Sequence, residues 1–501
     1  MKKYLRSVLT ALLLCSSGAF AYELIPTNAR LYEELNWLNN RNIIQINLST
    51  WPLSADEIRY ALDHAKTDTI NDAEIVNRIR QSLDNRNQRK FTLQTETQTE
   101  HPLLPIGMEQ PHDQHTISGN ANFSNERFDA NLQVNAYGGD AGGRSKRDMF
   151  EGETVKRTQK ADFAGSYGGI KIANQWLSVG QQDRFWGPGH EGSLILGDSA
   201  RPLPAVNLQR NVQKPFENKY LSWLGKWNYQ MFFGQMLNSD NMRSPRNTKL
   251  AGMRVTLSPT PYLDLGASRI IQWGGQGRIQ NWKAFGNAII GRDNDGYTGK
   301  DSYREPGNQL AGVDIRLKLH PLLKVPVSVY AQMVGEDEAN LFPSKNFFLA
   351  GIDGSHKISP NQTLNWHLEA ADTSTKLGKM TGVTYGHHLY KDGYYQQGMP
   401  MGHALGGDVR SVVLGVNSTL YNPSRSRLLQ SQHFGGKLMY AQTQRRNSAN
   451  EKSYKGMEVF WQGIIPLRRQ MDLQVGAKGW LVKPEQGKTQ AGASIKTGLT
   501  F

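Results

Sequence analysis

Apolar and polar residues alternate along most of this chain, and the alternation is clearest between Gln470 and Phe501. In the second half of this stretch the apolar residues fall at every second position except Thr497, at Ala491, Ala493, Ile495, Leu499 and Phe501. A period of two predicts a strand with one apolar and one polar face. An aromatic residue at the end of such a strand is typical of a barrel strand whose outer face meets lipid.

The same period predicts eighteen strands after the first ninety residues. Their predicted ranges are 91–99, 115–124, 128–137, 160–173, 176–183, 218–224, 227–237, 248–258, 261–273, 308–319, 325–335, 347–357, 362–372, 409–420, 430–443, 455–464, 470–482 and 490–501. Residues such as Val327 and Val329, or Tyr229 and Met231, would form the lipid face. Most Trp and Tyr residues then serve as interfacial anchors and bind nothing.

The connections between the predicted strands alternate between short and long. The short ones include 174–175, 225–226 and 359–361, and the longest of the others are 138–159, 184–217, 274–307 and 373–408. Outer-membrane barrels have short periplasmic turns and long extracellular loops. We therefore expect an all-β transmembrane barrel of about 18 antiparallel strands, occupying residues 89–501, with both chain ends in the periplasm.

Residues 1–21 have the features of a secretory signal peptide. A basic start is followed by an apolar run and by the cleavage-site sequence Ala19–Ala21. The only cysteine, Cys15, lies in this segment, so the mature chain would have no disulfide. A lipidated Cys15 is the less favoured alternative, because Leu14 occupies a position that requires a small residue.

Residues 22–88 have a helical period instead. Leu31, Leu35 and Leu38 share one helix face, and Ser54 and Glu57 form a capping box before a second helix. A third apolar stripe lies between residues 71 and 83. We expect a small periplasmic α-helical bundle that packs against something larger, because about 65 residues rarely form a stable core alone.

Composition limits the other protein classes. The chain has 50 glycines, 38% hydrophobic residues and no apolar run that approaches the length of a membrane helix. A polar, glycine-rich secreted β protein has a similar composition. The net charge of +14 is spread along the chain without a basic block, so no nucleic-acid partner is expected.

Several loop motifs occur in a specific order. They are FWGPG at 185–189, ARPLP at 200–204, EPGNQLAGVDIRL at 305–317, GEDE at 335–338 and GMPMGHALGGD at 398–408. Together with the helical start, these motifs resemble the Wzi family of outer-membrane capsule-assembly proteins over essentially the whole mature chain. The resemblance implies an eighteen-stranded barrel whose lumen is blocked by loops. It also implies a lectin-like protein, not an enzyme, that binds capsular polysaccharide and helps attach the capsule to the cell surface.

The candidate polysaccharide-binding residues are aromatic and polar side chains of the predicted loops. Aromatic rings stack on sugar faces, and arginine pairs with carboxylates of uronic acids in an acidic capsule. The candidates are Tyr385, His387, His388, Tyr390, Tyr394, Tyr395, His403, Asp408, Trp186, Arg201, Arg210, Glu336 and Asp337. The alternative is that Glu336, Asp337 and the arginines pair inside the barrel and hold its plug.

Other functions stay open at this point. His387 and His388 are adjacent but have no third ligand at a fixed spacing, so no metal and no cofactor is predicted. A barrel of this size could be a porin for oligosaccharides unless loops fill it. A hydrolase has no identifiable nucleophile and base. Outer-membrane lipid is an expected partner, and contact with the capsule export machinery stays open.

Overall fold

The computed structural model describes residues 24–67, 70–88, 91–110, 113–141, 160–240, 242–289, 307–339, 342–421, 429–443, 452–468 and 471–501. The predicted signal peptide lies outside these residues. Among the described residues no helix has the length and apolar character needed to cross a membrane.

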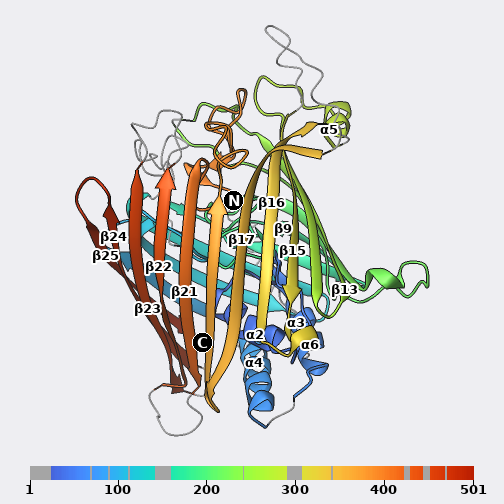
Figure 1. The fold of residues 1–501 in the computed structure, drawn as a ribbon, viewed down its shortest axis with the longest axis vertical. Helices are drawn as coiled ribbons and strands as arrows, with labels where there is room; N and C mark the ends of the chain where they lie inside the picture. The colour runs from blue at the N-terminus through green and yellow to red at the C-terminus, as the bar shows by residue number, and fades with distance from the viewer. Residues whose placement is uncertain are drawn as a thin grey trace, which may run out of the picture.

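The main element is a closed antiparallel barrel (Figure 1). Among the described residues it contains nineteen named strands, but β7 and β8 both pair with β6 and share one position, which leaves eighteen positions. The strands are β4 (Phe91–Gln98), β5 (Asp113–Ser124), β6 (Phe128–Ala141), β7 (Ala161–Asp162), β8 (Tyr167–Ile172), β9 (Gln175–Gly180), β11 (Ala205–Arg210), β12 (Lys226–Gln235), β13 (Lys249–Thr260), β14 (Leu263–Trp273), β15 (Gly307–Lys318), β16 (Val327–Ala339), β17 (Phe342–Ser359), β18 (Gln362–Asp372), β21 (Val409–Tyr421), β22 (Ser431–Thr443), β23 (Ser453–Arg468), β24 (Met471–Pro484) and β25 (Gln490–Thr500). The predicted fold class is confirmed.

The barrel closes between its last and first strands. β25 pairs with β4, with Leu499 opposite Leu93. Beyond the ladder, the backbone N–H groups of Phe501 and Phe91 each donate to the other residue's carbonyl, at 2.9 and 3.0 Å. Their rings stack with centroids 5.9 Å apart. Closure satisfies the backbone groups of both edge strands, which is a requirement in lipid.

Seventeen of the eighteen predicted strands overlap a barrel strand, and one prediction is wrong. Residues 218–224 are not a strand: they include the 3-10 helix η1 (Ser222–Leu224), and the barrel position belongs to β11. The sequence Tyr220 to Leu224 imitates a strand because apolar residues cluster there. The six residues of β11 alternate correctly, but they directly follow a long loop. So short an alternation is hard to recognise in the sequence.

The connections define two ends of the barrel, which we call the loop end and the short-turn end. The predicted alternation holds with two corrections. The connection between β16 and β17 at the loop end spans only residues 340–341, because both strands extend further than predicted. Residues 211–225, which join β11 to β12 at the short-turn end, form a long excursion.

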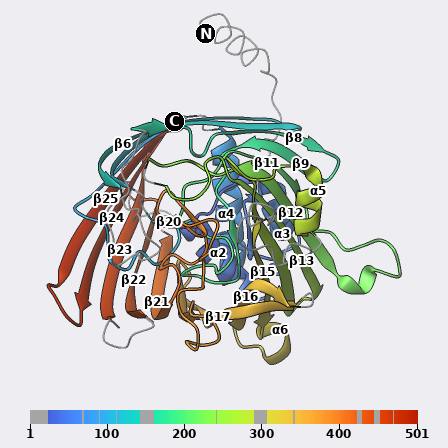
Figure 2. The ribbon, with the colours of Figure 1, turned by 90° about the horizontal axis from the view of Figure 1, so that it is seen from above.

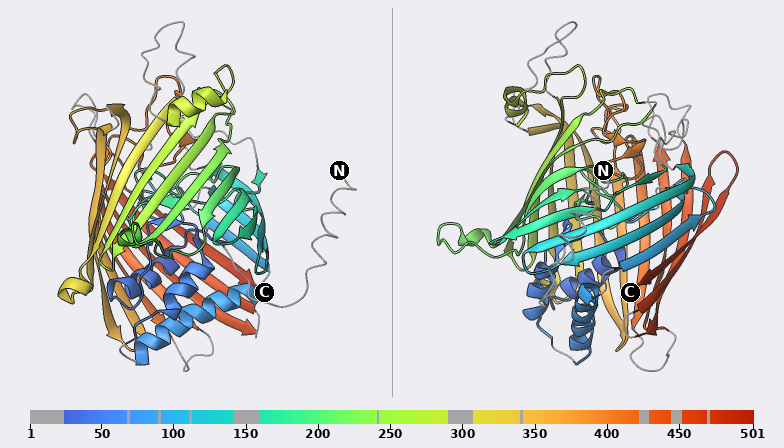
Figure 3. Two further views of the ribbon diagram at one scale, coloured as in Figure 1. Left: turned by 90° about the vertical axis from the view of Figure 1, so that its right-hand side faces the viewer. Right: turned by 180° about the vertical axis from the view of Figure 1, so that it is seen from behind.

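The N-terminal helices lie at the short-turn end and reach into the barrel (Figures 1 and 3). They are α2 (Ala29–Asn40), α3 (Ala55–Asp63) and α4 (Ile70–Gln88). Half of the predicted capping box is present: the Ser54 hydroxyl accepts the Glu57 N–H at 3.0 Å, but the Glu57 carboxylate accepts the N–H of Gln213 and not that of Ser54. Their apolar faces share one core with Phe185 of a loop and Tyr421 of the wall. The division into two domains near residue 88 stays a prediction.

Short elements connect these parts. β1 (Leu24–Ile25) pairs with β3 (Leu53–Ser54), and β10 (Phe185–Trp186) pairs with β2 (Thr50–Trp51). β19 (Tyr395–Gln396) and β20 (Met399–Pro400) form a hairpin within residues 373–408. α5 (Trp282–Ile289) lies at the loop end and α6 (His320–Leu323) at the short-turn end. Seen from above, the chain fills much of the space inside the strands (Figure 2).

Candidate functional site

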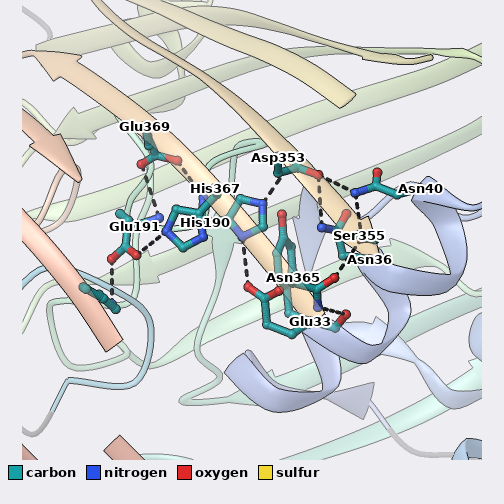
Figure 4. A network of polar contacts seen from close by, with 12 residues as sticks. Glu33, Asn36, Asn40, His190, Glu191, Asp353, Ser355, Asn365, His367 and Glu369 are labelled. Carbon is teal, nitrogen blue, oxygen red and sulfur yellow. Dashed lines mark hydrogen bonds and ion pairs between the residues drawn. The ribbon is translucent and has the colours of Figure 1, made fainter. Parts of the chain in front are cut away.

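A buried network of charges joins helix α2, one loop and the barrel wall (Figure 4). His190, in the loop between β9 and β11, lies between two carboxylates. Its Nδ1 is 2.9 Å from Glu33 of α2, and its Nε2 is 3.3 Å from Asp353 of β17. Asp353 also pairs with Arg316 of β15 at 2.6 Å and accepts from Asn40 of α2 at 2.5 Å. Three separate parts of the chain are therefore held at one point.

The same loop makes a second set of ion pairs one residue further on. Glu191 lies 2.6 Å from His367 of β18 and 2.7 Å from Lys437 of β22. Glu369 accepts the backbone N–H of His190 at 2.8 Å and the hydroxyl of Tyr330 at 2.8 Å. Buried charges require such partners, because an unpaired one is strongly destabilising.

Glu33, His190 and His367 offer ligand atoms within 4.8 Å of one another, which is the spacing of a metal site. The two imidazoles are stacked, however, with centroids 4.5 Å apart and planes inclined by 15°. Their lone pairs lie in nearly parallel planes and do not converge on one ion. Burial lowers the pKa of His190, but the adjacent carboxylates outweigh it and raise this pKa well above its ordinary value. The cluster fits an imidazolium held between carboxylates, and we interpret it as a lock for the loop.

All four tyrosines predicted to bind sugar, Tyr385, Tyr390, Tyr394 and Tyr395, are buried at the loop end. The Tyr385 hydroxyl donates to the Leu194 carbonyl at 2.5 Å and accepts the His403 N–H at 3.0 Å. The Tyr394 hydroxyl donates to the Ile195 carbonyl at 2.9 Å. These contacts fasten residues 373–408 to the loop between β9 and β11, in an apolar cluster that also contains Tyr395. Burial lowers the pKa of His403 to about 4, so its imidazole is neutral.

Two further candidates are buried in the same region. Trp186 donates its indole N–H to Gln230 of the wall. The Glu336 carboxylate accepts the backbone N–H of Tyr385. The side chain of Asp337 lies outside the described part of the structure. In this arrangement Trp186 and Glu336 position loops, and their role in polysaccharide binding stays a prediction.

The two candidate arginines lie at opposite ends of the barrel. Arg201 at the loop end pairs with Asp113 and, at 2.6 Å, with Asp162, which fits the alternative that arginines hold the plug. Arg210 ends β11 at the short-turn end, opposite Gln175. Its guanidinium lies 3.8 Å above the ring of Trp227 on the outer wall. Arg210 is thus distant from the loops with which the sequence analysis grouped it.

The remaining candidates are accessible at the loop end. His388 is exposed, and His387 and Asp408 are half-buried. Asp408 accepts the N–H of Gly382 at 2.7 Å, which shapes the loop. His387 packs beside Tyr390, with ring centroids 5.5 Å apart.

Three loops meet at this point, and we call their contact the three-loop junction. It comprises residues 242–248, 274–278 and 387–392. Asp392 accepts the backbone N–H groups of Arg243 and Ser244 at 2.8 and 2.6 Å. The buried Tyr390 donates its hydroxyl to the Gly274 carbonyl at 3.1 Å. Polar contacts and a buried ring therefore hold the junction in one conformation.

The three-loop junction carries four cations, which are Arg243, Arg246, Arg278 and Lys391. Arg243, Arg246 and Lys391 are exposed, and Arg278 lies over the Tyr390 ring at 5.4 Å. These residues are not among the candidates predicted from the sequence. They are distributed over three polar loops, with Arg243 and Arg246 in the same one, and only the folding of the loops brings them together. Basic residues within two positions of Pro245, Gly277 and Gly393 were the available signal.

Comparisons with known proteins agree with this architecture. The family model described as capsule assembly protein Wzi matches residues 85–480. An uncharacterized 55.8 kDa protein in the cps region of Klebsiella pneumoniae is 39% identical over 474 residues, covering 93% of this chain and 88% of that protein. The solved structure of Wzi from Escherichia coli has a TM-score of 0.81 and 35% identity, covering 95% of this chain and 99% of that one. That protein is described as an outer-membrane carbohydrate-binding β-barrel involved in group 1 capsule assembly. The chain is an outer-membrane β-barrel that belongs to the Wzi family of capsule assembly proteins.

Proposed function

We propose that this protein binds acidic capsular polysaccharide at its loop end and thereby holds the capsule on the cell surface. In this orientation the long loops are extracellular, and helices α2 to α4 face the periplasm. The proposal is supported by the Wzi relative from Escherichia coli, which is a carbohydrate-binding barrel. The protein acts as a lectin in this proposal and carries out no catalysis.

The observation that carries the proposal is the cationic surface of the three-loop junction. Arg243 exposes 54% of its side chain, and Arg246 and Lys391 are also exposed. A guanidinium matches the two oxygens of a carboxylate, so these groups suit the uronic acids of an acidic polymer. A polymer presents the same group repeatedly, and weak contacts then add through a high effective concentration.

Purified barrels with R246Q and K391Q test this proposal. Binding to immobilised acidic capsule is measured at two salt concentrations, alongside cell-bound and released polysaccharide. We expect at least a tenfold loss of affinity in low salt, a weaker salt dependence and more released polysaccharide. The matched control is R127Q with K324Q, which removes two exposed cations at the short-turn end. Equal binding by both double variants would refute the proposed site.

A porin function has less support. The wide barrel contains helices, a charged network and an apolar loop cluster (Figure 2). These elements occupy the space that an aqueous channel requires. Single-channel recording in a planar bilayer separates the two functions. A steady, large current from the unmodified protein would favour the porin.

A further inference from the structure

The connection between β11 and β12 projects sideways from the barrel at its short-turn end. It appears in green at the right of Figures 1 and 2 and contains η1. The other connections at this end among the described residues are short or form a compact turn such as α6. Residues 211–225 are therefore longer than a turn requires. We call the projecting part, residues 216–224, the aromatic finger.

The aromatic finger exposes three large apolar side chains. Tyr220, Leu221 and Trp223 are 71%, 41% and 69% exposed. Water is an unfavourable environment for so much apolar surface on one small projection. Trp and Tyr prefer the boundary between lipid headgroups and acyl chains, because each combines an apolar ring with a polar group.

The polar groups of the finger are largely paired within it. The Trp223 indole N–H donates to the Tyr220 carbonyl at 2.9 Å, and the Ser222 N–H donates to the Asn218 carbonyl at 2.8 Å. The Asn218 side chain accepts the N–H of Tyr220 at 2.9 Å. An internally bonded backbone can enter a membrane interface at low cost, because few groups lose hydrogen bonds to water.

A stack of flat groups fixes the base of the finger to the outer wall. Phe216 stacks on Trp227 with centroids 4.6 Å apart and planes inclined by only 4°. The guanidinium of Arg210 covers the same indole at 3.8 Å. Val206 and Met231, on the same two strands, are exposed apolar residues of the wall. The finger therefore starts from the surface that faces lipid and continues away from the barrel.

We propose that the aromatic finger inserts into the headgroup region of the phospholipid leaflet and anchors one side of the barrel. Lys219, whose ammonium lies 5.1 Å from the Tyr220 ring, would contact lipid phosphates. The sideways direction carries the finger away from the lumen and from helices α2 to α4 (Figure 3). The assignment to the periplasmic leaflet rests on the proposed orientation, whereas the lipid contact itself does not.

Site-specific labelling tests the finger, because Cys15 in the predicted signal peptide is the only cysteine of the chain. W223C and Y220C are each labelled with the fluorophore NBD and reconstituted into phosphatidylcholine–phosphatidylglycerol vesicles. E126C in the exposed turn between β5 and β6, at the same end, is the control. We expect lipids that carry a nitroxide near the headgroup to quench NBD fluorescence at position 223 at least threefold more than at position 126. Iodide in the aqueous phase should quench position 126 more than position 223.

Two results would overturn the proposal. Equal quenching at positions 223 and 126 would place the finger in water. Energy transfer between labelled barrels that increases with the protein-to-lipid ratio would identify a second copy as the occupant. Each labelled variant is first checked for the mobility shift on heating that marks a folded barrel. If W223C fails to fold, Y220C gives the same readout. If polysaccharide binding were absent but quenching were as expected, the proposed function would be contradicted and the lipid contact of the aromatic finger would stand.

Discussion

Nδ1 of His190 lies 2.9 Å from the carboxylate of Glu33, although the two residues are 157 positions apart. One belongs to a loop that enters the barrel from the loop end, and the other to a helix that enters from the short-turn end. Asp353 of the wall completes the contact on the other side of the imidazole. The loop and the helix inside the barrel are thus held to each other and to the barrel wall by the side chain of His190.

Replacing His190 with Gln should loosen the plug. The variant removes an imidazolium and leaves Glu33 without its cation, which typically costs about 3–5 kcal/mol for a buried pair. We expect a lower unfolding temperature and transient currents in planar bilayers. H388Q, which changes an exposed loop histidine, should match the unmodified protein in both measurements. An H190Q barrel with an unchanged unfolding temperature and no currents would show that the contacts of His190 are not needed to hold the loop.

The contact of α3 with residues 211–225 should depend on pH. Glu57 is buried and accepts the N–H of Gln213 at 2.6 Å, and burial raises its pKa to about 7. The folded chain then holds a proton that the unfolded chain releases near pH 4.5. Stability consequently falls as pH rises from about 4.5 to about 7, by at most about 3 kcal/mol.

Hydrogen exchange of residues 55–63 measures this effect. Protection should be stronger at pH 5 than at pH 8, after correction for intrinsic exchange. E57Q keeps an acceptor for Gln213 and should remove most of the difference. D63N, at an exposed carboxylate of the same helix, should retain it. A pH dependence that survives in E57Q would assign the effect to another group.

The strands were predictable because lipid and lumen impose opposite demands on alternate residues. β11 shows where this reasoning fails. Its inward residues Asn207 and Gln209 and its outward Val206 and Leu208 alternate correctly, but over too few residues to stand out. Trp223, in contrast, resembles a strand residue that faces lipid while lying in a projecting turn.

The candidate site was less predictable, because its residues meet only through loop packing. Arg243, Arg278 and Lys391 belong to three separate loops, and no period or spacing relates them. Tyrosine is also ambiguous in sequence, since its ring suits both a sugar face and a protein core. Tyr385 and Tyr394 are buried because residues 194 and 195 offer carbonyls to their hydroxyls. That partnership depends on tertiary structure.

Tyr385→Phe should separate packing from sugar contact. The change leaves the ring but removes the hydroxyl, so the Leu194 carbonyl and the His403 N–H both lose a partner. Unsatisfied buried groups of this kind cost about 1–3 kcal/mol. We expect a lower unfolding temperature but unchanged polysaccharide affinity of the folded fraction. H388F is the comparison variant, because it places a phenyl ring at an exposed position of the same loop. An affinity loss in Y385F without a stability change would restore Tyr385 as a sugar contact.

Asp392→Asn has two opposite effects on polysaccharide binding at the three-loop junction, and the larger effect determines whether binding becomes tighter or weaker. Removing a negative charge should favour an anionic ligand, but Asp392 is partly exposed and already pairs with Arg243 at 3.7 Å. In salt solution its effect on a ligand several ångströms away is therefore below about 1 kcal/mol. The carboxylate also accepts two backbone N–H groups, and hydrogen bonds to a charged group contribute about 1.5–3 kcal/mol each. Weakening them frees the loop that carries Arg243 and Arg246. We therefore expect D392N to bind acidic polysaccharide about three- to tenfold more weakly.

D240N removes an exposed charge from the same loop and should bind equally or slightly more tightly. Tighter binding by both variants would mean that net charge, and not the arrangement of the arginines, controls recognition.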